Sequence, residues 1–202
     1  MEYTFADAIS KGYAPNGGLF VPRSLPSFSV QELEEMSKDT YPEVAFSVIR
    51  RFIDESEICD EDLLEIMNST YSQFIDPANA VTVVQPPNVP SNVYISELFN
   101  GPTNCFKDLG LQGLINLLVY FCKKFDRRRT LVVATTGDTG PAAIKAVADA
   151  DCELLNIVVN YPEGQISDFQ RKQMTTIDSR RCKVSCFQGG GDDMDGPIKN
   201  IG

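Results

Sequence analysis

The chain of 202 residues contains no histidine, and this absence removes several kinds of chemistry. There can be no Ser-His-Asp or Cys-His arrangement and no histidine general base, so proton transfer must use Lys, Asp, Glu, Tyr or a cofactor. The six cysteines include no CxxC pair. A zinc site of cysteine and histidine is therefore excluded, the spacing argues against a site of cysteines alone, and we expect no metal. We interpret the cysteines as the reduced thiols of an intracellular protein.

Long apolar runs and a positive charge balance are also missing. No stretch of about 18 apolar residues occurs, so no membrane span is expected. The N-terminal sequence MEYTFADAIS lacks the apolar core of a secretory signal. The 28 acidic and 18 basic residues give a net charge of −10, which repels nucleic acid and anionic membranes. We therefore expect a cytoplasmic protein that binds neither nucleic acid nor a membrane, and the sequence leaves its oligomeric state open.

What is present is an ordinary globular composition, 43% hydrophobic and 23% charged, in a chain long enough to bury a core. The first part is predicted to be mostly helical. A short helix is expected over 5–10, and a second follows the capping-box pair Ser29 and Glu32. Two longer helices carry apolar stripes, one over 44–53 and one that Asp60 can cap. We interpret these stripes as core positions.

A proline-rich connector, QPPNVP at 85–90, is the best candidate for a domain boundary. We therefore divide the chain into a mostly helical region, 1–90, and an α/β region, 91–202. Beyond the connector, apolar segments typical of buried strands alternate with helical segments, which is the pattern of parallel βαβ units. The strands are expected over 93–99, 130–134, 154–160 and 182–187, and the helices over 109–124, 141–150 and 167–176.

One lysine stands where the chain passes from a predicted strand into a long helix. The segment SELFNGPTNCFKDLG, 96–110, places Lys107 just beyond a Gly-Pro-Thr turn. A solvated surface lysine is the simple interpretation. The functional interpretation is an amine nucleophile, which must lose its proton, and apolar neighbours such as Phe106 favour the neutral amine. A Schiff base with an aldehyde cofactor would also require a lysine fixed on rigid structure.

A second segment, ATTGDTGPAA at 134–143, follows a predicted buried strand and opens a helix. Ligands of open α/β sheets bind at this edge, and the free N–H groups of a helix N-terminus favour anions. Helix capping by Asp138 or Thr139 explains the loop equally well. The segment is neither a P-loop nor a GxGxxG loop. Set beside the first segment, it could face the same crevice as Lys107.

Four motifs, in order, resemble those of the threonine synthase family and, more closely, of its vertebrate threonine synthase-like members. They are GYAPNGGLFVP (12–22), ELFNGPTNCFKD (97–108), TTGDTGPAAI (135–144) and YPEGQISDFQRKQMTT (161–176), with a weaker echo in GDDMDGPIK (191–199). Several motifs in the right order are more specific than any one of them. The resemblance implies the tryptophan-synthase-β-like fold (fold type II) of pyridoxal-phosphate enzymes, with 91–202 as the first part of the catalytic domain.

The resemblance also implies roles for individual residues. Lys107 matches the lysine that holds pyridoxal phosphate and later moves protons on the substrate. Asp138 matches the position that faces the 3-oxygen of the cofactor ring. The loop that receives the substrate carboxylate matches Thr135, Thr136, Gly137 and Thr139. The implied substrate is O-phosphohomoserine, a small phosphorylated amino acid, which β,γ-elimination and replacement convert either to threonine or to 2-oxobutyrate, ammonia and phosphate.

Two features depart from the family pattern. Asn100 stands where relatives usually carry histidine, so the reaction is expected to be slower if that histidine moves protons. Relatives also continue into a glycine-rich loop that holds the cofactor phosphate, whereas the carboxylates of QGGGDD at 188–193 repel a dianion. We therefore expect the N-terminal half of the enzyme, with an incomplete site. The alternatives are a non-catalytic truncated product acting through protein contacts and an unrelated α/β anion-binding module.

Overall fold

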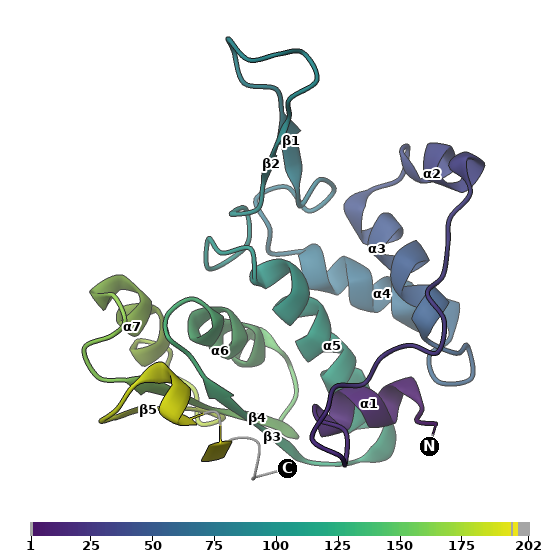
Figure 1. The fold of residues 1–202 in the computed structure, drawn as a ribbon. Coiled ribbons are helices and arrows are strands. Elements are labelled where there is room, and N and C mark those ends of the chain that lie inside the picture. Colours follow the sequence, from purple (N-terminus) through teal and green to yellow (C-terminus); the bar gives the residue numbers. More distant parts are fainter. Residues whose placement is uncertain (1, 195, 198–202) are drawn as a thin grey trace.

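The computed structural model describes residues 2–194, 196 and 197 (Figure 1). In chain order, the elements are α1 (Phe5–Lys11), α2 (Val30–Met36), α3 (Tyr41–Ile49), η1 (Arg50–Phe52), α4 (Asp60–Tyr71), β1 (Thr82–Val84), β2 (Ile95–Glu97), α5 (Asp108–Phe125), β3 (Arg129–Ala134), α6 (Thr139–Asp149), β4 (Leu155–Pro162), α7 (Asp168–Thr175), β5 (Cys182–Phe187) and η2 (Gly191–Met194). Within this described part of the chain, every helix is too short or too polar to cross a membrane. The cytoplasmic location stays a prediction.

The helices of the first part begin close to where the local sequence predicts. At α2, the hydroxyl of Ser29 accepts the N–H of Glu32 at 3.2 Å, and the Glu32 carboxylate accepts the N–H of Ser29 at 2.7 Å, which confirms the predicted capping box. The expected cap of α4 is wrong by one residue. Cys59 holds the extended N-cap backbone, while Asp60 is already helical and pairs with the Arg50 Nε at 3.0 Å.

Helix α5 connects two hydrophobic cores. Its Leu117 and Phe121 pack into a first core with the buried side chains of the helical region, and its Ile115, Leu118 and Cys122 pack into a second core with the sheet. The partners in the first core are Ala6, Ile53, Ile58, Leu63, Met67, Tyr71, Phe74 and Ala80. Because it is buried on two sides, α5 joins the helical region to the sheet.

A two-stranded hairpin projects away from both cores (Figure 1). Its strands β1 and β2 are antiparallel, with Val83 opposite Ser96. Of the strand expected over 93–99, only Ile95–Glu97 is formed, and it pairs with β1 rather than with the parallel strands. The ten residues of the loop between the two strands, 85–94, are enough to close an antiparallel pair. The proline-rich segment 85–90 lies in that loop, and the domain division at residue 90 stays a prediction.

The other three strands form the predicted parallel sheet, in the order β3-β4-β5. Leu131 lies beside Ile157, and Ile157 beside Cys182. When two successive right-handed crossovers each add a strand on the same side of the previous one, their helices cover the same face of the sheet. Figure 1 shows α6 and α7 on the same side of the sheet. Leu155, Ile157 and Val159 of the central strand are fully buried. The predicted α/β class is confirmed.

One arginine ties the end of α6 to the start of β5. The Arg181 guanidinium is almost buried and donates to five backbone carbonyl groups between the last turn of α6 and the start of β4. These belong to Val147 (2.8 Å), Ala148 (3.2 Å), Ala150 (2.7 Å), Cys152 (3.1 Å) and Leu155 (3.4 Å). The arginine therefore satisfies carbonyl oxygens that a helix end leaves without partners.

Candidate functional site

The N-terminus of α5 and the loop after β3 meet in one place. The Lys107 Nζ donates to the Thr139 Oγ1 at 2.6 Å and lies 3.1 Å from the Asp138 Oδ1. The lysine side chain is 30% exposed and the aspartate side chain 42%, so the pair is partly open to solvent. The structure therefore brings the predicted lysine into contact with the predicted loop, and we call the place where the two segments meet the lysine crevice.

The capping of α6 explains why Asp138 can face the lysine. Asp138 occupies the N-cap position, yet its side chain makes no capping hydrogen bond. The Thr135 hydroxyl instead accepts the N–H groups of Gly137 at 3.1 Å and Gly140 at 3.0 Å. Thr135 is buried beneath the loop. It thus supplies the cap that the sequence ascribed to Asp138 or Thr139, and its contact with a substrate stays a prediction.

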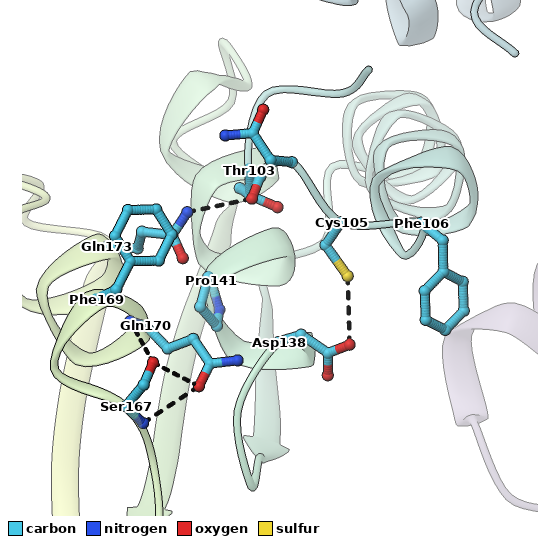
Figure 2. Close-up of a pocket in the computed structure, with 10 residues that line it drawn as sticks. Thr103, Cys105, Phe106, Asp138, Pro141, Ser167, Phe169, Gln170 and Gln173 are labelled. Atoms are coloured by element: carbon cyan, nitrogen blue, oxygen red, sulfur yellow. Dashed lines mark hydrogen bonds between the residues drawn. The ribbon is translucent and has the colours of Figure 1, made fainter. Parts of the chain in front are cut away.

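Asp138 has a second partner in Cys105, whose thiol donates to its Oδ2 at 3.3 Å (Figure 2). Partial burial acts to raise the pKa of Asp138, but the hydrogen bonds from Cys105 and Lys107 and the charge of Lys107 lower it below its ordinary value. Burial, and then the Asp138 carboxylate, raise the pKa of the Cys105 thiol. An ionised carboxylate is therefore held between a thiol donor and an amine.

A buried carboxyl group fixes the turn that precedes Lys107. Asp108 is fully buried, and its two oxygens accept the N–H and the hydroxyl of Thr103, both at 2.8 Å. A Cβ on Gly101 would lie 2.5 Å from the Cβ of Asp108, so only glycine leaves room for this approach. Sequence reasoning assigned no role to Thr103 or Asp108; the signal was the Gly-Pro-Thr turn directly before the lysine.

The remaining loop residues differ in their surroundings. Thr136 is exposed, whereas Gly137 is buried. A Cβ on Gly137 would lie 2.9 Å from the Nε2 of Gln170 in α7, so the loop backbone packs closely against that helix. Sequence reasoning missed Gln170, although it lies within one of the family-like motifs. Of the four residues predicted to bind the substrate carboxylate, Thr136 is thus the one that is exposed.

The structure changes one expectation about a neighbour of the lysine and shows what Asn100 contacts. Phe106 does not bury the amine: its side chain is 55% exposed, and the Lys107 Nζ lies 5.5 Å from its ring centroid. Asn100 is buried and donates to the Thr82 Oγ1 of β1 at 3.2 Å. The asparagine that replaces the family's histidine therefore holds the base of the hairpin.

A cavity of about 350 Å³ opens beside the Cys105–Asp138 pair (Figure 2). It is lined by the turn 103–106, by Asp138 and Pro141, and by the Ser167–Gln173 side of α7. Its volume lies within the range of small-molecule sites, about 300–1,000 Å³. The cavity can admit a small ligand next to the carboxylate that contacts Lys107.

The glycine run near the end of the chain is tied to its own carboxylate. The N–H of Gly190 donates to the Asp193 Oδ2 at 2.7 Å, so a donor that a phosphate would need is already used. A Cβ on Gly191 would lie 2.4 Å from the Thr136 Cγ2, which places this run against the site loop. The weak motif at 191–199 lies partly outside the described residues, at 195, 198 and 199.

Comparisons with known proteins agree with this geometry. A model of the threonine synthase N terminus matches residues 1–71. Threonine synthase of Pseudomonas aeruginosa is 37% identical over 195 residues, which are 96% of this chain and 40% of that protein. Threonine synthase-like 2 of Pongo abelii is 34% identical and covers 98% of this chain, again with 40% of that protein matched. The solved structure of pyridoxal-phosphate-bound threonine synthase from Brucella melitensis has a TM-score of 0.84 at 32% identity, over 98% of this chain and 41% of that one.

The two identities are too similar to decide whether the chain resembles the bacterial enzyme or the threonine synthase-like protein more. The chain spans about 40% of the length of the curated relatives it matches. In sequence and in fold, the chain belongs to the threonine synthase family, whose N-terminal portion it matches.

Proposed function

We propose that this chain provides the lysine-bearing part of a pyridoxal-phosphate-dependent enzyme that acts on O-phosphohomoserine. The observation that carries the proposal is the position of the Lys107 amine, which contacts Thr139 and Asp138, and Asp138 lines the cavity. Family membership supports the reaction class. The products are either threonine or 2-oxobutyrate with ammonia and phosphate.

The described residues fit the aldehyde end of pyridoxal phosphate. A primary amine at the start of a helix buried on two sides is a fixed nucleophile, as covalent attachment requires. Asp138, with its lowered pKa, is an ionised acceptor for a ring oxygen that carries a proton. The positive end of the α6 dipole favours a substrate carboxylate. We assign this carboxylate to the loop residues Thr135, Thr136, Gly137 and Thr139. The hydroxyls of Thr136 and Thr139 are the groups that can donate to it, because the Thr135 hydroxyl and the Gly137 N–H are bonded to each other.

Lys107 is the group suited to proton transfer in this site. The chain has no histidine, and the Lys107 Nζ is held at fixed distances by Asp138 and Thr139. When bound, pyridoxal phosphate delocalises the negative charge that forms at the α-carbon of an amino acid. The Lys107 Nζ takes the proton from that carbon and returns one to the substrate.

The described residues fit the phosphate group of the cofactor less well. A dianion needs several converging N–H donors. The Gly190 N–H is bonded to Asp193, and Asp192 adds a second carboxylate to the same run. We therefore expect a polypeptide of residues 1–202 alone to hold the cofactor weakly. The rest of the site belongs to the part of the family fold that these residues do not match.

Release of phosphate from O-phosphohomoserine, with saturating cofactor, tests the proposal. A polypeptide joining residues 1–202 to the remaining part of a threonine synthase is expected to be active, and Lys107→Ala is expected to abolish the activity. Lys145→Ala is the matched control, because Lys145 pairs with Asp149 on α6 at 2.7 Å. If the joined polypeptide folds and binds the cofactor but releases no phosphate, the alternative of a non-catalytic protein acting through protein contacts is correct.

A further inference from the structure

Helix α7 contacts both segments that form the lysine crevice. It is anchored by Met174, which is 1% exposed and packs against the start of α6: a Cβ on Gly140 would lie 2.6 Å from its Sδ. Since Gly140 immediately follows Thr139, this contact fixes α7 relative to the residue that holds the lysine amine. The helix is therefore a rigid support on one side of the crevice.

From this support, two glutamine side chains reach the two segments. Gln170 lies against Gly137 of the loop after β3, and its own orientation is set by the capping box with Ser167. Gln173, one turn later, donates from its Nε2 to the Thr103 carbonyl at 3.2 Å, across 70 residues of sequence (Figure 2). The same helix face thus touches both halves of the crevice.

The Gln173 bond acts on the turn that leads directly to the lysine. Thr103 is already fixed from one side, because its N–H and hydroxyl bond to Asp108 at the start of α5. Its carbonyl, on the other side of the peptide, is held by Gln173. The turn is therefore clamped between α5 and α7.

We propose that Gln173 is a positioning residue that holds the 101–107 turn closed over α7 and so keeps the Lys107 amine against Asp138 and Thr139. Its purpose in catalysis rests on the proposed function, but its effect on the lysine does not. When the bond to the Thr103 carbonyl is lost, the turn opens more often and the amine leaves its two partners more often. The net contribution of a hydrogen bond between uncharged groups corresponds to about a twofold to tenfold change in such an opening equilibrium.

The test uses Gln173→Met, which keeps the approximate length of the side chain and removes its amide, including the Nε2 donor. Lysine acetylation under limiting reagent, read by mass spectrometry, gives the rate at Lys107 relative to Lys145 in the same molecules. Hydrogen exchange of a peptide spanning the 101–107 turn, relative to one spanning β4, is the second readout. Gln165→Met is the matched control, since the Gln165 amide donates to the Gly189 carbonyl at 2.9 Å, outside the 101–107 turn.

Gln173→Met is expected to raise the relative acetylation of Lys107 about threefold or more and to speed exchange in the turn, while Gln165→Met changes neither. An unchanged ratio, or a uniform rise at all lysines and in β4, would overturn the proposal and leave Gln173 a general packing residue. If Gln173→Met does not fold, Gln173→Glu of equal length decides by the same ratios. Neither readout uses the cofactor, so failure of the proposed function would leave this result standing.

Discussion

Replacing Gly101 by alanine is expected to loosen the turn that leads to Lys107. The new Cβ would lie 2.5 Å from the Asp108 Cβ, whereas carbon atoms in contact need about 3.5–4.0 Å, so one of them must move by about 1 Å. The Asp108 Cβ is attached to the first turn of α5 and cannot rotate away. Overpacking costs about 1–3 kcal/mol, and weaker hydrogen bonds from Thr103 add about 1–2 kcal/mol. A loss of about 3 kcal/mol lowers the Tm of a chain of this size by roughly 6–12 °C.

Gly110→Ala is the matched control for this change. Gly110 is the third residue of α5, and a Cβ there would have nothing within 4 Å. Alanine in a helix is favoured over glycine by about 0.8–1.0 kcal/mol, so the Tm of this variant should stay level or rise slightly. Thermal unfolding followed by circular dichroism measures both. Equal Tm values for the two variants would refute the close approach of Gly101 to Asp108.

Two further predictions concern local contacts. Arg181→Met removes the donors to five carbonyl groups and should lower the free energy of unfolding, measured in urea, by about 3 kcal/mol. Arg180→Met, at an exposed neighbour, should change it by less than about 0.5 kcal/mol. Equal losses in the two variants would contradict the role of Arg181. The N–H and hydroxyl of Ser29, with Arg51, lower the pKa of Glu32 to about 2. A carboxyl group whose pKa is lowered in the folded state stabilises the fold when it is ionised. The contribution of Glu32 is therefore present above pH 4.5, its ordinary pKa, and is lost as the pH falls toward 2. An NMR titration should find the midpoint near 2 in the parent and higher in Ser29→Ala, and midpoints of 4.5 in both would rule out the capping box.

The elements that sequence reasoning predicted well are those that local chemistry determines. The capping box at Ser29 and Glu32 needs only residues three apart, and the long apolar helix, α5, needs only its own periodicity. The pairing of β2 could not be predicted in the same way. A three-residue strand takes its partner from tertiary context, and the choice between an antiparallel neighbour and the parallel sheet depends on where the connecting loop closes.

The candidate site shows the same limit at the level of side chains. The contact between Lys107 and the loop 135–139 was predicted, but from a strand before Lys107 that pairs with β1 and not with the parallel sheet. Which residue of the loop caps α6 could not be predicted, because Asp and Thr side chains can each cap a helix. Only the structure shows that Thr135 does so. The bond from Gln173 to Thr103 joins segments 70 residues apart, and no local pattern in the sequence encodes it.

The identity of the cofactor lysine is the central claim, and reductive trapping tests it most directly. The polypeptide joining residues 1–202 to the remaining part of a threonine synthase would be incubated with pyridoxal phosphate, reduced with borohydride and mapped by mass spectrometry. Our account predicts that the pyridoxyl group is found mainly on Lys107 and that Lys107→Ala removes this label without raising it elsewhere. Predominant labelling of Lys145 or Lys172, with Lys107 unmodified, would contradict the account.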